Sequence, residues 1–198
     1  MYKFAILGGM FNPIHNGHIY IASKVLELGI AHKVLFMPSG NHPLKDNQLA
    51  LDYADRYKLI EKAIVGFDKL EVSSLDSPEY GINYTYNLIQ RLFENYSKDD
   101  FTFLIGMDNA TSFNLWNNHQ WLLENVHFTV LSREDSNPSN TQIDSNFNLV
   151  EIPLYNVSST EIREKLELGL SISTLVPQVI EHDLQDYWKK FKLLSHQS

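Results

Sequence analysis

The sequence predicts an α/β fold, in which a doubly wound parallel sheet carries helices on both faces and one domain spans residues 1–198. The first reason is that short β-rich runs alternate with segments of helical period along the whole chain. The second is the length of the chain, which is typical of one domain. No repeat or linker divides the chain. Right-handed crossovers between parallel strands then place ligands outside the carboxyl ends of the strands.

Six β-rich runs are the expected strands, and six segments of helical period separate or follow them. The strands are predicted at Tyr2–Leu7, Lys33–Met37, Leu70–Ser73, Phe101–Ile105, Val126–Leu131 and Leu149–Ile152. The helices are predicted at His18–Leu28, Tyr53–Val65, Thr85–Tyr96, Asn109–Leu123, Thr160–Leu168 and Gln178–Tyr187. Functional residues are therefore expected in the loops that follow the strands.

The chain holds 16 Lys and Arg residues against 24 Asp and Glu residues, a formal net charge of −8. An acidic surface repels a polyanion, which argues against a nucleic-acid partner and requires any anionic ligand to be held locally. The absence of Cys excludes a disulfide framework, a thiolate metal site and a cysteine nucleophile. No run approaches the roughly 20 apolar residues of a membrane span, and the first apolar run is too short for a signal peptide. We therefore expect a cytoplasmic protein without a membrane partner.

A glycine-containing loop, GGMFNPIHNGH, follows the first expected strand. Gly8 and Gly9 let a ligand approach the backbone closely, and the helix N-terminus beyond them offers free N–H groups to an anion. The position is that of a phosphate site. The spacing matches neither the dinucleotide fingerprint nor the P-loop, which disfavours a hydride-transfer enzyme and a P-loop ATPase.

His15 and His18 lie in this loop, three positions apart. Two imidazoles at such a site would donate hydrogen bonds to the oxygens of a triphosphate, where charge accumulates during phosphoryl or nucleotidyl transfer. Two solvent-facing histidines are the alternative. A zinc site is a third interpretation, which the lack of Cys and of any acidic residue in the loop disfavours.

A second anion site is indicated near the other end of the chain, where the run VSSTEIR opens a helix. Ser158 as N-cap, with Glu161 three residues later, makes a capping box. Ser159 and Thr160 in the first turn expose amides and hydroxyls, and Arg163 lies one turn along on the same side. The alternative is a simple cap followed by a solvated arginine.

The pattern G-G-x-F-x-P-x-H-x-G-H resembles the signature of the nucleotidylyltransferase superfamily of Rossmann-like enzymes, and its pairing with S-S-T-x-x-R resembles the adenylyltransferases. The resemblance implies an ATP site in which both histidines and the arginine contact the triphosphate and are catalytic. Asn12 stands where many members have Asp. The residues implied to bind ATP are Gly8, Gly9, Met10, His15, His18, Ser159, Thr160 and Arg163.

The run FLIGMDN after the fourth expected strand, with Trp116 further on, indicates where an acceptor binds. Gly106 permits close backbone approach, and Asp108 is able to accept hydrogen bonds from ribose hydroxyls. An indole at Trp116 is able to stack on a pyridine ring. Phe113 and Trp116, three positions apart, are equally interpretable as core residues of a helix.

The arrangement I-G-x-D-N…F-x-x-W is similar to that of bacterial nicotinate mononucleotide adenylyltransferases, and the similarity runs from Tyr2 to Trp188. The runs Pro43-Leu44-Lys45, Tyr84-Thr85 and Leu131-Ser132-Arg133 match as well. The resemblance implies that the mononucleotide is bound by Lys45, Tyr84, Thr85, Gly106, Asp108, Trp116 and Arg133.

Several positions depart from the family pattern, and three of them lie next to predicted acceptor residues. Leu44 replaces the histidine of N-P-P-H-K, Asn83 replaces the serine of S-Y-T, and Glu134 follows Arg133 where proline is usual. These departures bear on loop geometry and affinity more than on the type of reaction.

The resemblance implies transfer of the adenylyl group of ATP to nicotinate mononucleotide, which forms deamido-NAD and pyrophosphate in NAD biosynthesis. Mg²⁺ is expected to be held through the ATP phosphates, without a dedicated set of protein ligands. The sequence predicts no oligomeric state. Two alternatives stay open. The first is a related adenylyltransferase that accepts nicotinamide mononucleotide or phosphopantetheine; the second is a nucleotide-binding regulator without chemistry, against which both histidines and Arg163 argue.

Overall fold

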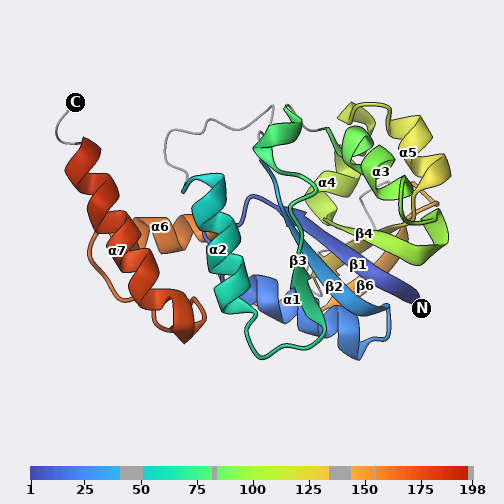
Figure 1. Ribbon diagram of the computed structural model, residues 1–198. Helices are drawn as coiled ribbons and strands as arrows, with labels where there is room; N and C mark the ends of the chain where they lie inside the picture. Colours follow the sequence, from blue (N-terminus) through green and yellow to red (C-terminus); the bar gives the residue numbers. More distant parts are fainter. Residues whose placement is uncertain (41–50, 82–83, 134–143, 154, 196–198) are drawn as a thin grey trace.

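The computed structural model describes residues 1–40, 51–81, 84–133, 144–153 and 155–195, in which one parallel sheet lies between two sets of helices (Figure 1). All six strands pair in parallel, in the order β3-β2-β1-β4-β5-β6. The strands are β1 (Tyr2–Gly9), β2 (Ala31–Pro38), β3 (Leu70–Val72), β4 (Phe101–Gly106), β5 (Phe128–Arg133) and β6 (Asn148–Ile152). The predicted strands and the doubly wound architecture are confirmed.

Seven α-helices connect or follow these strands within the described ranges. They are α1 (Asn16–Glu27), α2 (Tyr53–Ala63), α3 (Thr85–Phe93), α4 (Met107–Thr111), α5 (His119–Asn125), α6 (Ser159–Glu167) and α7 (Gln178–Ser195). Short 3₁₀ turns lie at Pro78–Tyr80, Lys98–Asp100 and Phe113–Leu115. None of the helices described here is both long and apolar enough to cross a membrane.

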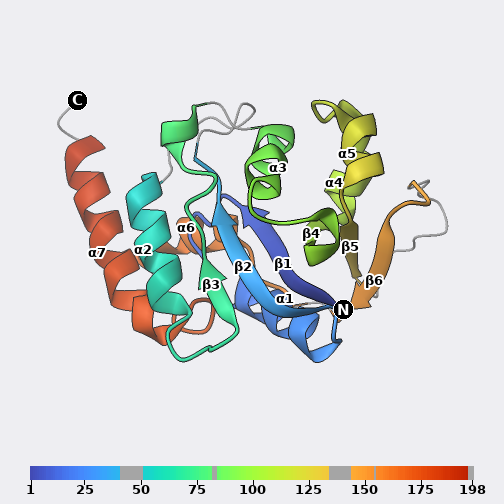
Figure 2. The same cartoon turned by 45° about the vertical axis from the view of Figure 1, so that its right-hand side comes forward.

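Side chains alternate between the two faces of β1, and each face is covered by its own helices (Figures 1 and 2). Ala5 and Leu7 pack into a cluster with residues of α1, α2, α6 and α7, whereas Ile6 packs into a second cluster with residues of α3, α4 and α5. Since β2 lies on one side of β1 and β4 on the other, the order of strands reverses there. The crevice at the carboxyl ends of β1 and β4 is the switch point at which such sheets bind ligands.

The single helix predicted over Asn109–Leu123 is wrong, because the chain breaks there into α4, a 3₁₀ turn and α5. The Ser112 hydroxyl donates to the backbone carbonyl of Asp108 at 2.8 Å, a local bond that competes with continued helical pairing. Asn118 adopts a left-handed conformation with φ of 53°, which asparagine tolerates better than most residues. Trp116 therefore stands in extended backbone, with ψ of 145°, instead of on a helix face.

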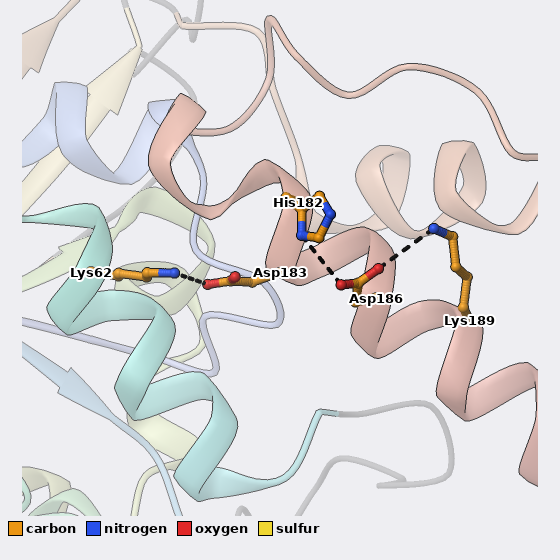
Figure 3. Close-up of polar contacts among 5 residues, drawn as sticks. All are labelled: Lys62, His182, Asp183, Asp186 and Lys189. Carbon is orange, nitrogen blue, oxygen red and sulfur yellow. Dashed lines mark hydrogen bonds and ion pairs between the residues drawn. The ribbon is translucent and has the colours of Figure 1, made fainter.

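The C-terminal helix α7 runs past the end predicted for it and packs against α2 (Figure 3). Lys62 of α2 pairs with Asp183 of α7 at 2.6 Å. Exposed pairs of this kind contribute about 0–1 kcal/mol each, so the apolar residues that the two helices bury together do more to hold them. The other pairs drawn in Figure 3 join Asp186 to His182 and to Lys189, within α7 itself.

Candidate active site

A cavity of about 640 Å³ opens at the switch point of the sheet, a size typical of small-molecule sites. The carboxyl ends of β1 and β4 and the start of α3 line it, together with the segment that follows the 3₁₀ turn after α4. The cavity thus lies where the sequence places the ligand. The predicted site residues that line it are Gly8, Gly9, Met10, Tyr84, Thr85 and Trp116.

The start of α6 lies against the glycine-containing loop after β1, although the bonded residues are 146 and 151 positions apart. Arg163 donates from Nη1 to the backbone carbonyl of Asn12 at 2.8 Å, and the Ser159 hydroxyl donates to the carbonyl of Pro13 at 2.9 Å. Nη2 of Arg163 donates to Oγ1 of Thr160 at 3.1 Å. The solvated-arginine alternative is wrong, because this guanidinium joins the two predicted anion sites.

Ser158 caps α6 as predicted, since its Oγ accepts a hydrogen bond from the backbone N–H of Glu161 at 3.1 Å. The N–H groups of the first turn have no partner within the helix, and the helix dipole makes this end partly positive. The cap and the predicted anion site therefore use different residues of one turn. Ser158 serves the helix backbone, while Ser159 and Arg163 serve the loop after β1.

His15 and His18 stack on each other at the start of α1, with ring centroids 3.7 Å apart. The backbone N–H of His15 donates to Nδ1 of His18 at 3.2 Å, so the neutral His18 ring carries its proton on Nε2, where a ligand is able to accept it. Burial lowers the pKa of His15 to about 4, and burial together with His15 lowers the pKa of His18 well below its usual value. Both rings are therefore neutral near pH 7. The interpretation as two solvent-facing histidines is wrong, since His15 is 7% exposed.

Arg56 is a residue of this region that sequence reasoning missed. It is 3% exposed and comes from α2, where it donates from Nη1 to the carbonyl of Met10 at 2.7 Å and from Nε to the carbonyl of Leu51 at 3.1 Å. The N–H of Leu51 in turn donates to Oδ1 of Asn12 at 3.1 Å, an acceptor that Asn and Asp both provide. A signal was present, since Arg56 shares the apolar face of a predicted helix with Leu59, three positions on.

The acceptor side of the cavity is built by the start of α3 and by Trp116. Tyr84 precedes α3 and gives no side-chain cap. The N–H of Asn87 donates to the carbonyl of Tyr84 at 2.9 Å, whereas those of Thr85 and Tyr86 make no bond within the described residues and suit an anionic group. Trp116 stacks on the buried Phe113, with centroids 4.8 Å apart and 29° between the planes, and also lines the cavity. The two interpretations of Trp116, as core residue and as pocket residue, are thus compatible.

Four predicted acceptor residues are not brought to the cavity by described contacts. Gly106 and Asp108 are exposed and do not line it, whereas the neighbouring Asn109 does. Lys45 and the side chain of Arg133 lie outside the described residues. The departures from the family pattern at Leu44, Asn83 and Glu134 also lie outside them.

Asp76 is the second residue that sequence reasoning missed. It follows β3, lines the cavity and is 9% exposed. Burial raises the pKa of this carboxyl to about 7, against the opposing effect of Arg91, whose Nη2 lies 3.7 Å from Oδ1. Its place in a loop after a strand was the one signal for it, and that signal is shared by every residue of the loop.

Together these features define a class of protein. Two neutral imidazoles and an arginine meet at the loop after β1, whose residues Gly8, Gly9 and Met10 line the cavity, although none of the three side chains lines it. Such donors bind phosphates and stabilise charge that develops on them. A site of this kind is that of a nucleotidyltransferase. The chain belongs to the cytidylyltransferase-like family, whose model matches residues 6–165.

Two relatives in this family carry the name "Probable nicotinate-nucleotide adenylyltransferase". The one from Clostridium tetani is 35% identical over 196 residues, which cover 94% of this chain and 98% of the relative. The one from Clostridium novyi is 35% identical over 187 residues, which cover 90% and 94%. The structure of Plasmodium falciparum nicotinic acid mononucleotide adenylyltransferase complexed with NaAD aligns with a TM-score of 0.71 over 98% of this chain and 97% of that chain. At 22% identity, that likeness shows the fold.

Proposed function

We propose that the protein transfers the adenylyl group of ATP to nicotinate mononucleotide, forming deamido-NAD and pyrophosphate. The observation that carries the proposal is the junction of the two signature segments, in which Arg163 and Ser159 donate to the loop that holds His15 and His18. This junction gathers the phosphate-binding groups beside a cavity large enough for a second nucleotide. The names of the relatives support the same reaction.

The acceptor phosphate is itself an anionic nucleophile, so the reaction requires no protein nucleophile. One of its oxygens forms a bond to the α-phosphorus of ATP, while the bond from that phosphorus to the oxygen bridging to the β-phosphate breaks. Pyrophosphate leaves with the electron pair of that bond. Catalysis then consists of alignment and of charge stabilisation, which Nε2–H of His18 and the guanidinium of Arg163 supply.

Mg²⁺ fits this site as a cation carried by the nucleotide. In the part of the chain that the structure describes, no three His, Cys, Asp or Glu side chains gather to hold a metal ion, and the phosphate-binding groups are neutral imidazoles and a cation. The phosphate oxygens of ATP are therefore the ligands we expect, with water completing the shell. When bound, the ion neutralises charge on the phosphates.

On the acceptor side, Trp116 stacks on the pyridine ring, and the amides at Tyr84 and Thr85 bind its carboxylate. A carboxylate at a helix N-terminus is favoured by the dipole, whereas a neutral carboxamide gains less, so this contact favours the acid form of the mononucleotide. The predicted roles of Lys45 and Arg133 toward the phosphates also belong to this proposal. Gly106 and Asp108 are the remaining residues predicted to contact the mononucleotide, although they do not line the cavity.

The test is pyrophosphate release from ATP and Mg²⁺, with nicotinate mononucleotide, nicotinamide mononucleotide and phosphopantetheine supplied separately. We expect release with nicotinate mononucleotide at the highest kcat/KM. A higher kcat/KM with another acceptor would assign the chain to a related adenylyltransferase. ATP binding without release from any of the three would favour the nucleotide-binding regulator.

A further inference from the structure

The carboxyl group of Asp76 has no role in the reaction described so far. Its Oδ1 is buried and makes no hydrogen bond with the part of the chain that the structure describes, although the residue lines the cavity. Buried carboxylate oxygens are nearly always hydrogen-bonded, because leaving one without a donor costs about 1–3 kcal/mol or more. An acceptor in this state, at the wall of a binding site, indicates a donor that arrives with the ligand.

The backbone around Asp76 is fixed, so the carboxyl is held in place. Its carbonyl accepts a hydrogen bond from the N–H of Gly40 at 2.8 Å, and a Cβ at Gly40 would meet that oxygen at 2.8 Å. Arg91 of α3 donates from Nε to the carbonyl of Leu75 at 3.0 Å and stacks over the ring of Tyr80 at 4.4 Å. Asp76 is thus placed by strand, turn and helix without help from its own side chain.

Two charged or titratable groups on neighbouring helices interact with this carboxyl, and a third lies in its own segment. Arg91 lies on α3 at 3.7 Å from Oδ1, a distance at which it attracts the carboxylate without a hydrogen bond. Tyr53 comes from α2, where burial raises its pKa to about 12 and the charges of Tyr57 and Asp76 add to the rise. Glu79 follows in the 3₁₀ turn, where it accepts a hydrogen bond from the Ser77 hydroxyl at 2.7 Å. None of these contacts supplies the missing donor.

The chemistry of a pyridine mononucleotide says which of its groups suits Asp76. Its phosphate and the carboxylate of nicotinate are anionic acceptors, which a carboxylate repels. Its ribose hydroxyls are donors. Because Asp76 shares the cavity with Tyr84, Thr85 and Trp116, the ribose next to the ring is the donor within its reach.

We propose that Asp76 is a substrate-binding residue whose carboxylate accepts a hydrogen bond from a ribose hydroxyl of the pyridine mononucleotide. This inference rests on the proposed function, although the ribose is common to nicotinate and nicotinamide mononucleotides. It adds a binding contact to the acceptor site and leaves the triphosphate site unchanged.

The experiment combines a protein change with a substrate change. Asp76→Ala and wild type are assayed for pyrophosphate release with nicotinate mononucleotide and with its 2′-deoxy and 3′-deoxy forms. A hydrogen bond to a charged group predicts a loss of about ten- to a hundred-fold in kcat/KM for the mononucleotide, with KM for ATP unchanged. With wild type, kcat/KM for one of the deoxy forms should be lower than that for the mononucleotide by the same factor. With Asp76→Ala, kcat/KM for that deoxy form should equal that for the mononucleotide, because the variant already lacks the bond.

Two further variants keep the test independent of folding. Asp76→Asn preserves size and should fold, and its thermal unfolding is measured beside Glu79→Gln, which removes a negative charge from the same segment outside the cavity. Glu79→Gln should leave KM for the mononucleotide unchanged. In wild type this KM should rise as the pH falls through about 7, because protonation removes the charged acceptor, and the rise should be smaller in Asp76→Asn.

The assignment would be overturned if every deoxy substrate lowered kcat/KM by the same factor in wild type and in Asp76→Ala. The effects of the protein change and the substrate change would then be independent. A KM that rises above pH 7 would also overturn it, because a protonated carboxyl would then be donating to the nicotinate carboxylate. If wild type prefers nicotinamide mononucleotide, the proposed function fails but the same deoxy comparison is made with that substrate. Release with phosphopantetheine alone, which has no such ribose, would overturn both proposals.

Discussion

The two sides of the cavity are built differently. On the triphosphate side, three backbone carbonyls of the loop after β1 each accept a hydrogen bond from a partly or fully buried side chain, at 2.7, 2.8 and 2.9 Å. On the acceptor side, the chain runs through a broken helix, and Tyr84 and Leu115 are 42% and 80% exposed. We therefore predict that the first side is a prearranged phosphate site and that the second is ordered to a greater degree by its ligand. Changes on the first side should therefore cost rate, and changes on the second should cost affinity.

The largest effect is expected at His18. Its Nε2–H is aimed by the bond that Nδ1 accepts from His15, so His18→Ala removes a preorganised donor to the phosphates. Losing one such donor typically costs about 10²–10³ in kcat. The measurement is kcat beside a melting curve, with His18→Asn as the control that keeps an N–H donor. A near-normal kcat in His18→Ala would remove this histidine from the catalytic set.

A pH effect of comparable size is expected in the stability of the triphosphate side. Burial lowers the pKa of His15 to about 4, from about 6.5 in the unfolded chain, so below pH 6.5 the unfolded state binds more protons. The free energy of unfolding should fall as the pH drops from about 6.5 to about 4, by roughly 3 kcal/mol for this group. Denaturant titrations of wild type and His15→Gln measure the effect. Identical slopes for the two proteins in this window would contradict it.

Asp76, on the acceptor side, should show the opposite slope. Its pKa is raised to about 7 in the folded protein, so between pH 4 and 7 the folded state binds more protons than the unfolded state. The stability due to this group should fall as the pH rises through that window. In Asp76→Asn the free energy of unfolding should not show this fall, so the variant should gain stability relative to wild type as the pH rises to 8. If the free energy of unfolding changes equally with pH in both proteins, burial does not affect this carboxyl.

Arg163→Ala should lower kcat/KM for ATP by about ten- to a hundred-fold, since hydrogen bonds to charged groups are worth about 1.5–3 kcal/mol. The bond from Nη1 to the carbonyl of Asn12 adds a structural cost that the sequence did not indicate. The variant should therefore also melt at a lower temperature than wild type. Arg163→Lys, which retains the charge but not the two-pronged geometry, separates the two effects. Normal ATP affinity with early melting would leave Arg163 with a structural role.

The sequence predicted the cap at Ser158 and pointed to the two segments that meet after β1, because their determinants are local. Glycines, a proline and two histidines stand in one short run, and Ser158 and Glu161 form a cap that neighbouring residues specify. The sheet followed for the same reason, since its central strands contain short, largely apolar runs. Arg56 and Asp76 were missed because their roles depend on burial and on partners from other segments. For Arg56 the one local signal was its place on the apolar face of a predicted helix. The break after Thr111 was missed because a side-chain bond to the backbone outweighed an amphipathic pattern.

Ser158→Ala should cost about 1 kcal/mol of stability, within the range of about 0.5–2 kcal/mol for a lost N-cap. Its hydroxyl serves the N–H of Glu161 and does not contact the loop after β1 among the bonds of the described residues. KM for ATP and kcat should therefore stay close to those of wild type. Ser159→Ala is the matched control, because its hydroxyl donates to the carbonyl of Pro13, and it should change the kinetics more than the melting temperature.

The smallest effect, and the one that most directly tests the acceptor side, is expected for Trp116→Leu. Stacking of an aromatic pair is worth roughly 0.5–1.5 kcal/mol beyond area burial, so KM for nicotinate mononucleotide should rise about two- to ten-fold while KM for ATP is unchanged. Leucine keeps apolar volume beside Phe113, on which the indole stacks, so the melting temperature should change little. Trp116→Ala removes that volume as well. Truncating a fully buried tryptophan lowers the free energy of unfolding by about 3–5 kcal/mol. Because Trp116 is partly exposed, its truncation should cost less. Both KM values and a melting curve are measured for each variant. If the leucine variant keeps its KM for the mononucleotide and loses stability, Trp116 acts as a core residue and the two sides of the cavity do not differ in the way proposed here.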